Sequence, residues 1–160
     1  MNDRPVVPTL PLRTISGQEI ALDVPRPFLL PITVSDADLD GQGHVNNSVY
    51  VRWMDRAAYA HSAALGYDWA RYQAMGASFV VRRHEIDYLA PTFAGESIVV
   101  ATWPHAMERF TAGRSHQIVR LEDGRTVARA MTTWVFLDLA TGRPRRMPED
   151  LIRDFTGAGT

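Results

Sequence analysis

One long helical pattern, at residues 48–65, limits the possible folds of this chain more than any other feature. Apolar side chains recur there in two adjacent stripes at helical spacing, with Trp53 and Met54 among them, and the remaining polar face is narrow. Asn46 and Asn47 precede the pattern as N-cap candidates, and Gly66 follows it where a helix-ending glycine belongs. At 1.5 Å per residue this helix would be ~27 Å long. So wide an apolar face has to be enclosed, and a sheet curling round the helix is its natural partner.

The segments on both sides of this helix are rich in β-forming residues. A strand is expected before it at 28–34, and short helices are expected at 68–75 and 148–155. After Gly76 the chain has the pattern of four further strands, with Pro91 and Pro104 predicted to stop the first two. These four strands are expected at 78–89, 96–103, 115–121 and 126–139. The predicted fold class is α+β, with five antiparallel strands wrapped around one long helix.

The chain is long enough for a single domain with one sizeable core. It has 160 residues, of which 46% are hydrophobic. Residues 1–27 carry five prolines and predict an extended arm, with a short hairpin against the domain, whereas 28–160 form the domain itself. A single sheet on one helix leaves its edge strands exposed, so we expect a homodimer or a homotetramer that pairs them.

Composition excludes several classes of function. The net charge of −1 gives no reason to expect a nucleic acid or an anionic membrane as partner. Cysteine is absent, which rules out disulfides, thiolate metal sites and a thiol nucleophile. Neither a signal-peptide pattern nor an apolar run of membrane-spanning length is present, so the cytoplasm is the expected location. Four of the five histidines share no spacing typical of metal ligands and predict no metal site; they are His61, His84, His105 and His116.

The loop that leads into the long helix, residues 38–47, carries an unusual concentration of reactive side chains. Asp40 could act as a nucleophile or activate water, and His44 could assist it or act as the base itself. The backbone amides at the helix start, from Asn46 onward, could stabilise an oxyanion that develops on a carbonyl. Asp and Gly also serve as ordinary turn residues, so Asp40 has a structural alternative, and Asp38 is expected to be structural. A carboxylate, an imidazole and amide donors together indicate attack on an activated acyl group.

The pattern DLDxxxHVNNxxYVxW at residues 38–53 resembles the acyl thioesterases of the hotdog-fold superfamily. It looks like the branch of 4-hydroxybenzoyl-CoA thioesterase and the YbgC-type acyl-CoA thioesterases, with a loop similar to that of acyl-ACP thioesterases. The resemblance extends over residues 34–147 and includes IDYLAP at 86–91, with Gly95 and Glu96 behind it. It implies a hotdog fold, in which a five-stranded antiparallel sheet surrounds the helix, and a double-hotdog dimer that often forms a tetramer.

The same resemblance implies roles for individual residues. In the aromatic acyl-CoA branch the second Asp of D-x-D is the essential carboxylate and a Gly follows three residues later, positions held here by Asp40 and Gly43. The amide that polarises the thioester then falls on Asn47. The histidine of the acyl-ACP branch is kept as His44, whereas Gln42 replaces its asparagine. That branch also uses a later glutamate on a strand, for which Glu85 and Asp87 are both candidates.

The expected reaction is hydrolysis of an acyl-CoA or acyl-ACP thioester to a free acid, with no cofactor. Catalytic roles are expected for Asp40, His44 and Asn47. The acyl chain would enter between the helix and the sheet. Arginine binds phosphate through a bidentate fork, so exposed arginines could hold the phosphates of CoA. The predicted substrate-binding residues are Asn46, Arg82, Arg83, Arg143 and Arg145. A hydratase or dehydratase that acts on acyl thioesters and a non-catalytic acyl-CoA-binding module are the alternatives.

Overall fold

A computed structural model describes residues 8–157 of the chain. Its central element is the helix α1 (Asn47–Ala64), which lies within one residue of the predicted span. The Oδ1 atom of Asn46 accepts a hydrogen bond from the backbone N–H of Ser48 and so caps the helix. Gly66 ends it with a φ of +86°, a conformation that glycine adopts without a steric penalty. The sequence thus specifies both ends of the helix.

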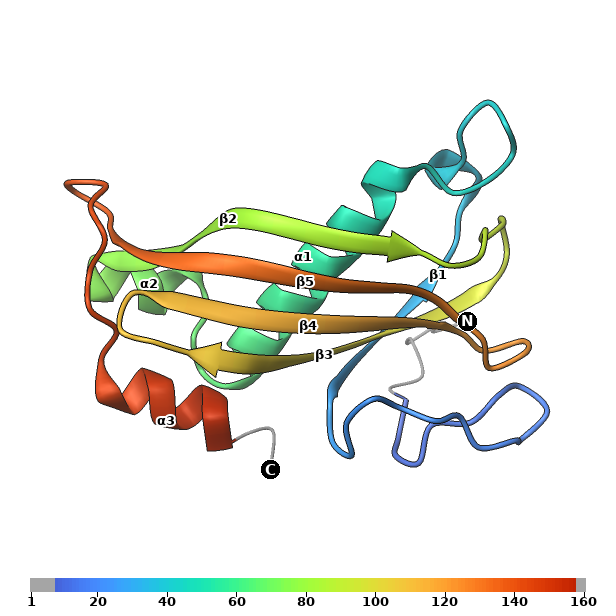
Figure 1. Ribbon diagram of the computed structural model, residues 1–160, viewed down its shortest axis with the longest axis horizontal. Coiled ribbons are helices and arrows are strands. Elements are labelled where there is room, and N and C mark those ends of the chain that lie inside the picture. Colours follow the sequence, from blue (N-terminus) through green and yellow to red (C-terminus); the bar gives the residue numbers. More distant parts are fainter. Residues whose placement is uncertain (1–7, 158–160) are drawn as a thin grey trace.

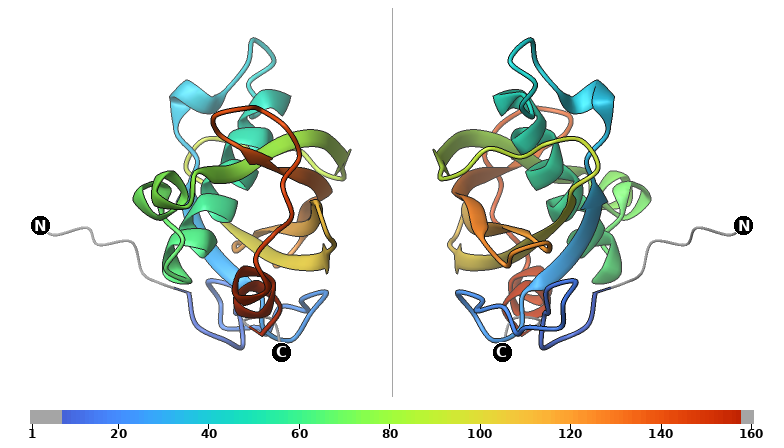
Figure 2. Two further views of the ribbon diagram at one scale, coloured as in Figure 1. Left: turned by 90° about the vertical axis from the view of Figure 1, so that its left-hand side faces the viewer. Right: turned by 90° about the vertical axis from the view of Figure 1, so that its right-hand side faces the viewer.

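Five antiparallel strands form one sheet around α1. They are β1 (Phe28–Thr33), β2 (Ala77–Tyr88), β3 (Ser97–Met107), β4 (Thr111–Arg120) and β5 (Thr126–Asp138), in the order β1-β3-β4-β5-β2. Figure 1 shows α1 crossing behind the sheet, and the end-on views of Figure 2 show the strands curving around it. The predicted sheet and its central helix are confirmed. The two edges of the sheet are β1 and β2.

The main core lies between α1 and the concave face of the sheet. Trp53, Met54 and Ala57 from the helix are at most 2% exposed. They belong to one apolar cluster with inward-facing strand residues such as Ile98 and Ile118, both fully buried. Because strand side chains alternate between faces, the neighbouring Val99 and Val119 point to the convex side instead.

The hairpin of β3 and β4 is longer than the sequence predicts. We expected Pro104 to stop the first of these strands and the second to begin at residue 115, and both expectations are wrong. The register shifts between Pro104 and Ala106, and such an irregularity accommodates a residue that has no N–H to donate to the ladder. The strand continues to Met107, and β4 begins four residues before the predicted start. This extension brings Arg114 into the sheet.

Short elements close the two ends of the core. The helices α2 (Trp69–Met75) and α3 (Glu149–Gly157) pack at the carboxyl end of α1, where Tyr72, Phe136 and Phe155 belong to a second apolar cluster. At the other end the 3₁₀-helix η1 (Asp36–Asp38) leads into the loop before α1. Both helices were predicted. No helix among the described residues is long and apolar enough to cross a membrane.

The described part of the N-terminal arm packs on the convex face of the sheet. Leu12 and Ile20 are buried against Val99 and Val119, and an isolated antiparallel bridge joins Arg13 to Glu19. This bridge is the short hairpin that the sequence predicts. Residues 1–7 of the predicted arm lie outside the described residues.

Candidate active site

The loop before α1 folds back on itself and brings Asp40 close to His44. The backbone N–H of Asp40 donates to the carbonyl of His44 at 2.8 Å, and the N–H of Gly43 donates to the carbonyl of Asp40 at 3.0 Å. Gly43 has a φ of +77°, which explains why glycine is needed three residues after Asp40. The tight loop therefore places an aspartate and a histidine side by side at the amino end of the helix.

The two aspartates of this loop have different environments. Asp38 accepts hydrogen bonds from the backbone N–H and the hydroxyl of Ser35, at 3.0 and 2.9 Å, and forms an ion pair with Arg52 at 3.3 Å. Asp40 is half-buried, and within residues 8–157 its carboxylate has one hydrogen bond, from the N–H of Gln42 at 2.8 Å. Asp38 is thus committed to the loop, as predicted, whereas Asp40 keeps acceptor capacity for a water or a substrate.

A cavity of about 370 Å³ lies at the amino end of α1. The three residues predicted to be catalytic, Asp40, His44 and Asn47, all line it. Its other lining residues are Gln42, Val45, Tyr50, Tyr88, Leu89, Ala90 and Pro91. The first N–H groups of a helix have no partner within the helix, and the Asn46 side chain accepts only that of Ser48. The amino end of α1 therefore offers further N–H donors and a partial positive charge. A developing oxyanion would be stabilised there.

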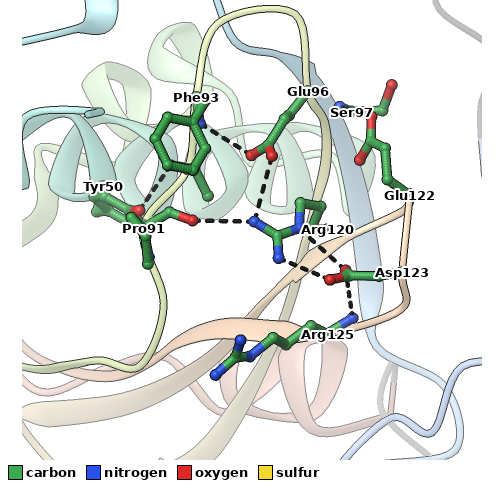
Figure 3. Close-up of polar contacts among 10 residues, drawn as sticks. Tyr50, Pro91, Phe93, Glu96, Ser97, Arg120, Glu122, Asp123 and Arg125 are labelled. Carbon is green, nitrogen blue, oxygen red and sulfur yellow. Dashed lines mark hydrogen bonds and ion pairs between the residues drawn. The ribbon is translucent and has the colours of Figure 1, made fainter. Parts of the chain in front are cut away.

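The far wall of the cavity is the loop between β2 and β3, and Arg120 holds it in place (Figure 3). The guanidinium donates to the carbonyl of Pro91 at 3.1 Å and pairs with Glu96 at 3.3 Å and with Asp123 at 2.7 Å. Glu96 in turn accepts the N–H of Phe93 at 3.0 Å. Arg120 lowers the pKa of Asp123 to about 2, and the two carboxylates raise the pKa of Arg120 itself. The charge of Arg120 is therefore compensated by two carboxylates.

This wall also contacts the loop before α1 directly. The ring of Phe93 meets the ring of His44 edge to face, with centroids 5.2 Å apart. The carbonyl of Thr92 accepts the N–H of Val45 at 2.9 Å, and its hydroxyl shares a 2.8 Å hydrogen bond with the hydroxyl of Tyr50. The position of His44 is thus linked through the loop to Arg120.

The residues predicted to bind substrate lie outside this cavity. Asn46 is an exposed N-cap, and the four arginines are exposed and do not line the cavity. Arg83 pairs with Glu85 at 2.7 Å, and Arg145 donates to the carbonyl of Met75 and pairs with Asp138 at 3.6 Å. The remaining two are Arg82 on β2 and Arg143 after β5. Their role in binding stays a prediction.

Neither strand carboxylate considered from the sequence lines the cavity. Glu85 and Asp87 are both exposed on β2. A different carboxylate stands out, that of Asp55 on α1, whose buried Oδ1 atom has no hydrogen-bond partner among the described residues. Burial raises its pKa. By its spacing in the sequence, Asp55 belongs to the ordinary polar face of the helix, and no pattern there indicates a buried carboxylate.

One cavity residue that sequence reasoning missed is Tyr88. It lies at the end of β2, and its hydroxyl donates to the carbonyl of Asn47 at 3.1 Å. The sequence held one indication that Tyr88 belongs to the site. It lies in the IDYLAP segment, which resembles the same thioesterases as the loop before α1 does.

Comparison with known proteins identifies the family. A model of the thioesterase-like superfamily matches residues 34–155, which is most of the domain. The chain belongs to this superfamily. The predicted assignment as a thioesterase is therefore confirmed, and so is the hotdog fold, which the similar solved structures share.

Several solved structures illustrate the likeness. A 1,4-dihydroxy-2-naphthoyl-CoA thioesterase from Synechocystis has 19% identity and a TM-score of 0.74, with coverage of 81% of this chain and 95% of the relative. A thioesterase from Thermus thermophilus, complexed with coenzyme A and zinc, has 27% identity and a TM-score of 0.72, with coverage of 82% and 92%. A DHNA-CoA thioesterase from Staphylococcus aureus has 22% identity and a TM-score of 0.72, with coverage of 81% and 86%.

Proposed function

We propose that this thioesterase hydrolyses acyl-CoA thioesters at the cavity beside the amino end of α1. The observation that carries the proposal is the convergence of Asp40, His44 and Asn47 on that one cavity. Similar structures named as CoA thioesterases support coenzyme A as the carrier.

In the proposed reaction the thioester carbonyl lies against the N–H of Asn47. Asp40 either takes a proton from a water that attacks the carbonyl or attacks the carbonyl itself to form an anhydride that water then opens. In both routes the carbon–sulfur bond breaks, and the thiolate of CoA leaves and takes up a proton. The acid gains one oxygen, either from the water directly or, through the anhydride, from Asp40, whose carboxylate the water then restores. The amide and the helix end stabilise the negative charge on the carbonyl oxygen in the tetrahedral intermediate. His44 holds the water or shares the proton of Asp40.

We also propose that two copies of the chain associate through β2. This strand is an edge of the sheet, and it presents Val80 and Val81, which are 43% and 39% exposed. Unpaired strand edges with apolar side chains are normally covered. Light scattering after size-exclusion chromatography should give a dimer or a multiple of it, and a monomer at micromolar concentration would refute the proposal.

The first experiment is a panel of acyl-CoAs, aliphatic and aromatic, in which free thiol is followed over time. Asp40→Asn should lower the rate by about 10²–10⁴, because the amide can neither accept a proton nor attack. The matched control is Asp36→Asn, the same change on an exposed side chain of η1, and it should leave the rate unchanged.

The panel also separates the alternatives. Undiminished hydrolysis by Asp40→Asn would remove this residue from the mechanism. Tight binding of acyl-CoA without thiol release would indicate a binding module, and loss of an enoyl double bond without thiol release would indicate a hydratase.

A further inference from the structure

A second, smaller cavity lies at the opposite end of α1. Its volume is about 50 Å³, room for a few atoms, since one water needs roughly 10–15 Å³ on the same measure. Ser62 of the helix lines this cavity, and Asn47 lines the first one. Their separation along the helix is ~22 Å. The walls are mostly aromatic and aliphatic, with Phe79, Met107 and Phe155 among them.

Arg114 lines this apolar cavity without a counter-ion. The residue is 6% exposed, and within residues 8–157 no carboxylate lies at ion-pair distance from it. Its Nη1 atom makes hydrogen bonds to the Nδ1 atom of His61 at 3.1 Å and to the hydroxyl of Thr102 at 3.3 Å. Both partners are uncharged at neutral pH, because burial, together with the nearby guanidinium, lowers the pKa of His61 to about 4.

The guanidinium nevertheless keeps its charge. Burial lowers the pKa of Arg114 to about 10, which is still well above neutral pH. A buried and uncompensated cation costs several kcal/mol, as a general expectation for charges removed from water. Buried charges are normally paired, so the missing anion points to a ligand.

A second buried donor belongs to a residue that lines the cavity. Trp134 is one of the lining residues, and within residues 8–157 its buried indole Nε1–H has no hydrogen-bond partner. The nearby hydroxyls of Ser62 and Tyr72 are bonded to each other at 2.8 Å, and the Ser62 hydroxyl also donates to the carbonyl of Tyr67. The site thus has a surplus of donors and of positive charge inside an apolar enclosure.

We propose that this cavity is a second binding site, for a short monocarboxylic acid of the size of acetate or propionate. Arg114 would pair with the carboxylate, as a guanidinium fork matches two carboxylate oxygens, and the aromatic and aliphatic walls would contact the hydrocarbon part. The site is separate from the candidate active site and does not depend on the proposed reaction. Free carboxylic acids are, however, the class of compound that thioester hydrolysis releases, so occupancy of this site would report the level of product.

The test measures binding to the full chain without any thioester. Acetate and propionate, which match a cavity of a few atoms, are titrated by calorimetry and by tryptophan fluorescence, beside acetamide, propionamide, and inorganic phosphate and sulfate. The carboxylates should bind saturably, once per chain, and roughly tenfold or more tighter than the amides, since the charged pair is lost in the amides. The inorganic anions should bind more weakly, because they cannot fill the apolar part.

Two variants locate the site. Arg114→Met should weaken carboxylate binding roughly tenfold or more and should leave the melting temperature unchanged or raise it, because an unpaired buried charge is replaced by an apolar chain. The matched control, Arg125→Met, removes an exposed arginine and should bind as the wild type does. Trp134→Phe keeps an aromatic ring at this position, removes the indole N–H together with part of the ring system, and should weaken binding while Arg114 stays in place.

Several results would overturn the proposal. They are the absence of saturable binding to the wild type at millimolar concentration, equal binding of acid and amide, equal binding of inorganic phosphate, and binding that survives Arg114→Met. Binding that is lost in Asp40→Asn but kept in Arg114→Met would place the acid in the active site instead. If Arg114→Met does not fold, the proposal is tested by the preference of the wild type for acid over amide and by the loss of binding in Trp134→Phe. No outcome here bears on hydrolysis, so the two proposals fail separately.

Discussion

Two arginines of β4 serve the two ends of α1 in opposite ways. Arg120 pairs with Glu96 and Asp123 and bonds a carbonyl of the loop that walls the larger cavity. Arg114, six residues earlier, has a neutral imidazole and a hydroxyl as its only side-chain partners in the described part of the chain. The pKa of Arg120 is raised by its carboxylates, and that of Arg114 is lowered by burial.

The difference separates a structural arginine from a binding one. At Arg120 the chain itself supplies the negative charge, so the side chain is fully explained as a brace for the loop that contacts His44. At Arg114 the described residues supply no negative charge, and a bound anion would be needed to compensate the guanidinium. A buried arginine is therefore informative mainly through what compensates its charge.

The largest expected effect in the comparison is on stability in acid. As the pH falls below 6.5 the unfolded chain binds protons before the folded protein does, because burial lowers the pKa of His61 to about 4 and that of His116 to about 3. The free energy of unfolding should fall over this window, with about 3 kcal/mol from His61 alone. Denaturant titrations at a series of pH values measure it.

The contribution of the Arg120–Asp123 ion pair to the free energy of unfolding should be lost at a lower pH than that of His61. The stabilising contribution of Asp123 is present above its ordinary pKa of 3.8 and is lost as the pH falls towards about 2. His61→Gln should reduce the slope only in the upper window, and Asp123→Asn only in the lower one. A slope between pH 6.5 and 4 that His61→Gln does not change would contradict the assignment.

The next largest effect is expected from removing the brace. Arg120→Met removes the cation that pairs with two carboxylates and the donor to a carbonyl, and should cost about 2 kcal/mol, or ~4–8 °C in melting temperature for a chain of this size. The rate of thiol release should also fall, because Phe93 is no longer held against His44. Equal losses of melting temperature in Arg120→Met and Arg114→Met would remove the contrast between the two arginines.

A matched pair at the two ends of α1 should have smaller effects. Asn46→Ala removes the cap, and Gly66→Ala forces a side chain into a positive φ; each should cost about 1 kcal/mol of unfolding free energy. Only Asn46→Ala should also lower thiol release, since it loosens the helix end that faces the substrate. Comparable activity losses in both variants would mean that helix stability, rather than the amino end, controls the rate.

The smallest effect is expected from an arginine outside both cavities. Arg83 and Glu85 form an exposed pair, with side chains 66% and 44% exposed, so Arg83→Gln should change stability by less than about 0.5 kcal/mol. If Arg83 meets the phosphates of CoA, the KM should rise a few-fold at unchanged kcat. Steady-state kinetics at low and high salt measure it, and an unchanged KM would exclude Arg83 from binding.

Local signals explain why so much of the fold could be predicted. The helix from 47 to 64 was found because its apolar spacing, its Asn46 cap and its Gly66 terminator are all encoded in adjacent residues. The extension of β3 beyond Pro104 was missed, because a register shift that accommodates a proline depends on the partner strand and leaves no mark in the sequence. The start of β4, and with it Arg114, was lost for the same reason.

The candidate site divides along similar lines. Asp40, His44 and Asn47 are close in sequence, so one loop motif predicted the group that lines the cavity. Arg120 and Tyr88 reach that region from other strands, and the buried Arg114 pairs with a histidine 53 positions away. Charge compensation across such separations is a property of the folded protein, and composition alone gives no indication of it.

The packing of the N-terminal arm has a consequence for higher assembly. Leu12 and Ile20 cover Val99 and Val119, so the chain itself occupies the convex side of β3 and β4. Two sheets cannot stack back to back over these strands while the arm is in place. An assembly larger than a dimer has to use other surfaces. Removal of the arm would expose the apolar side chains of Val99 and Val119 and so create a new surface for association.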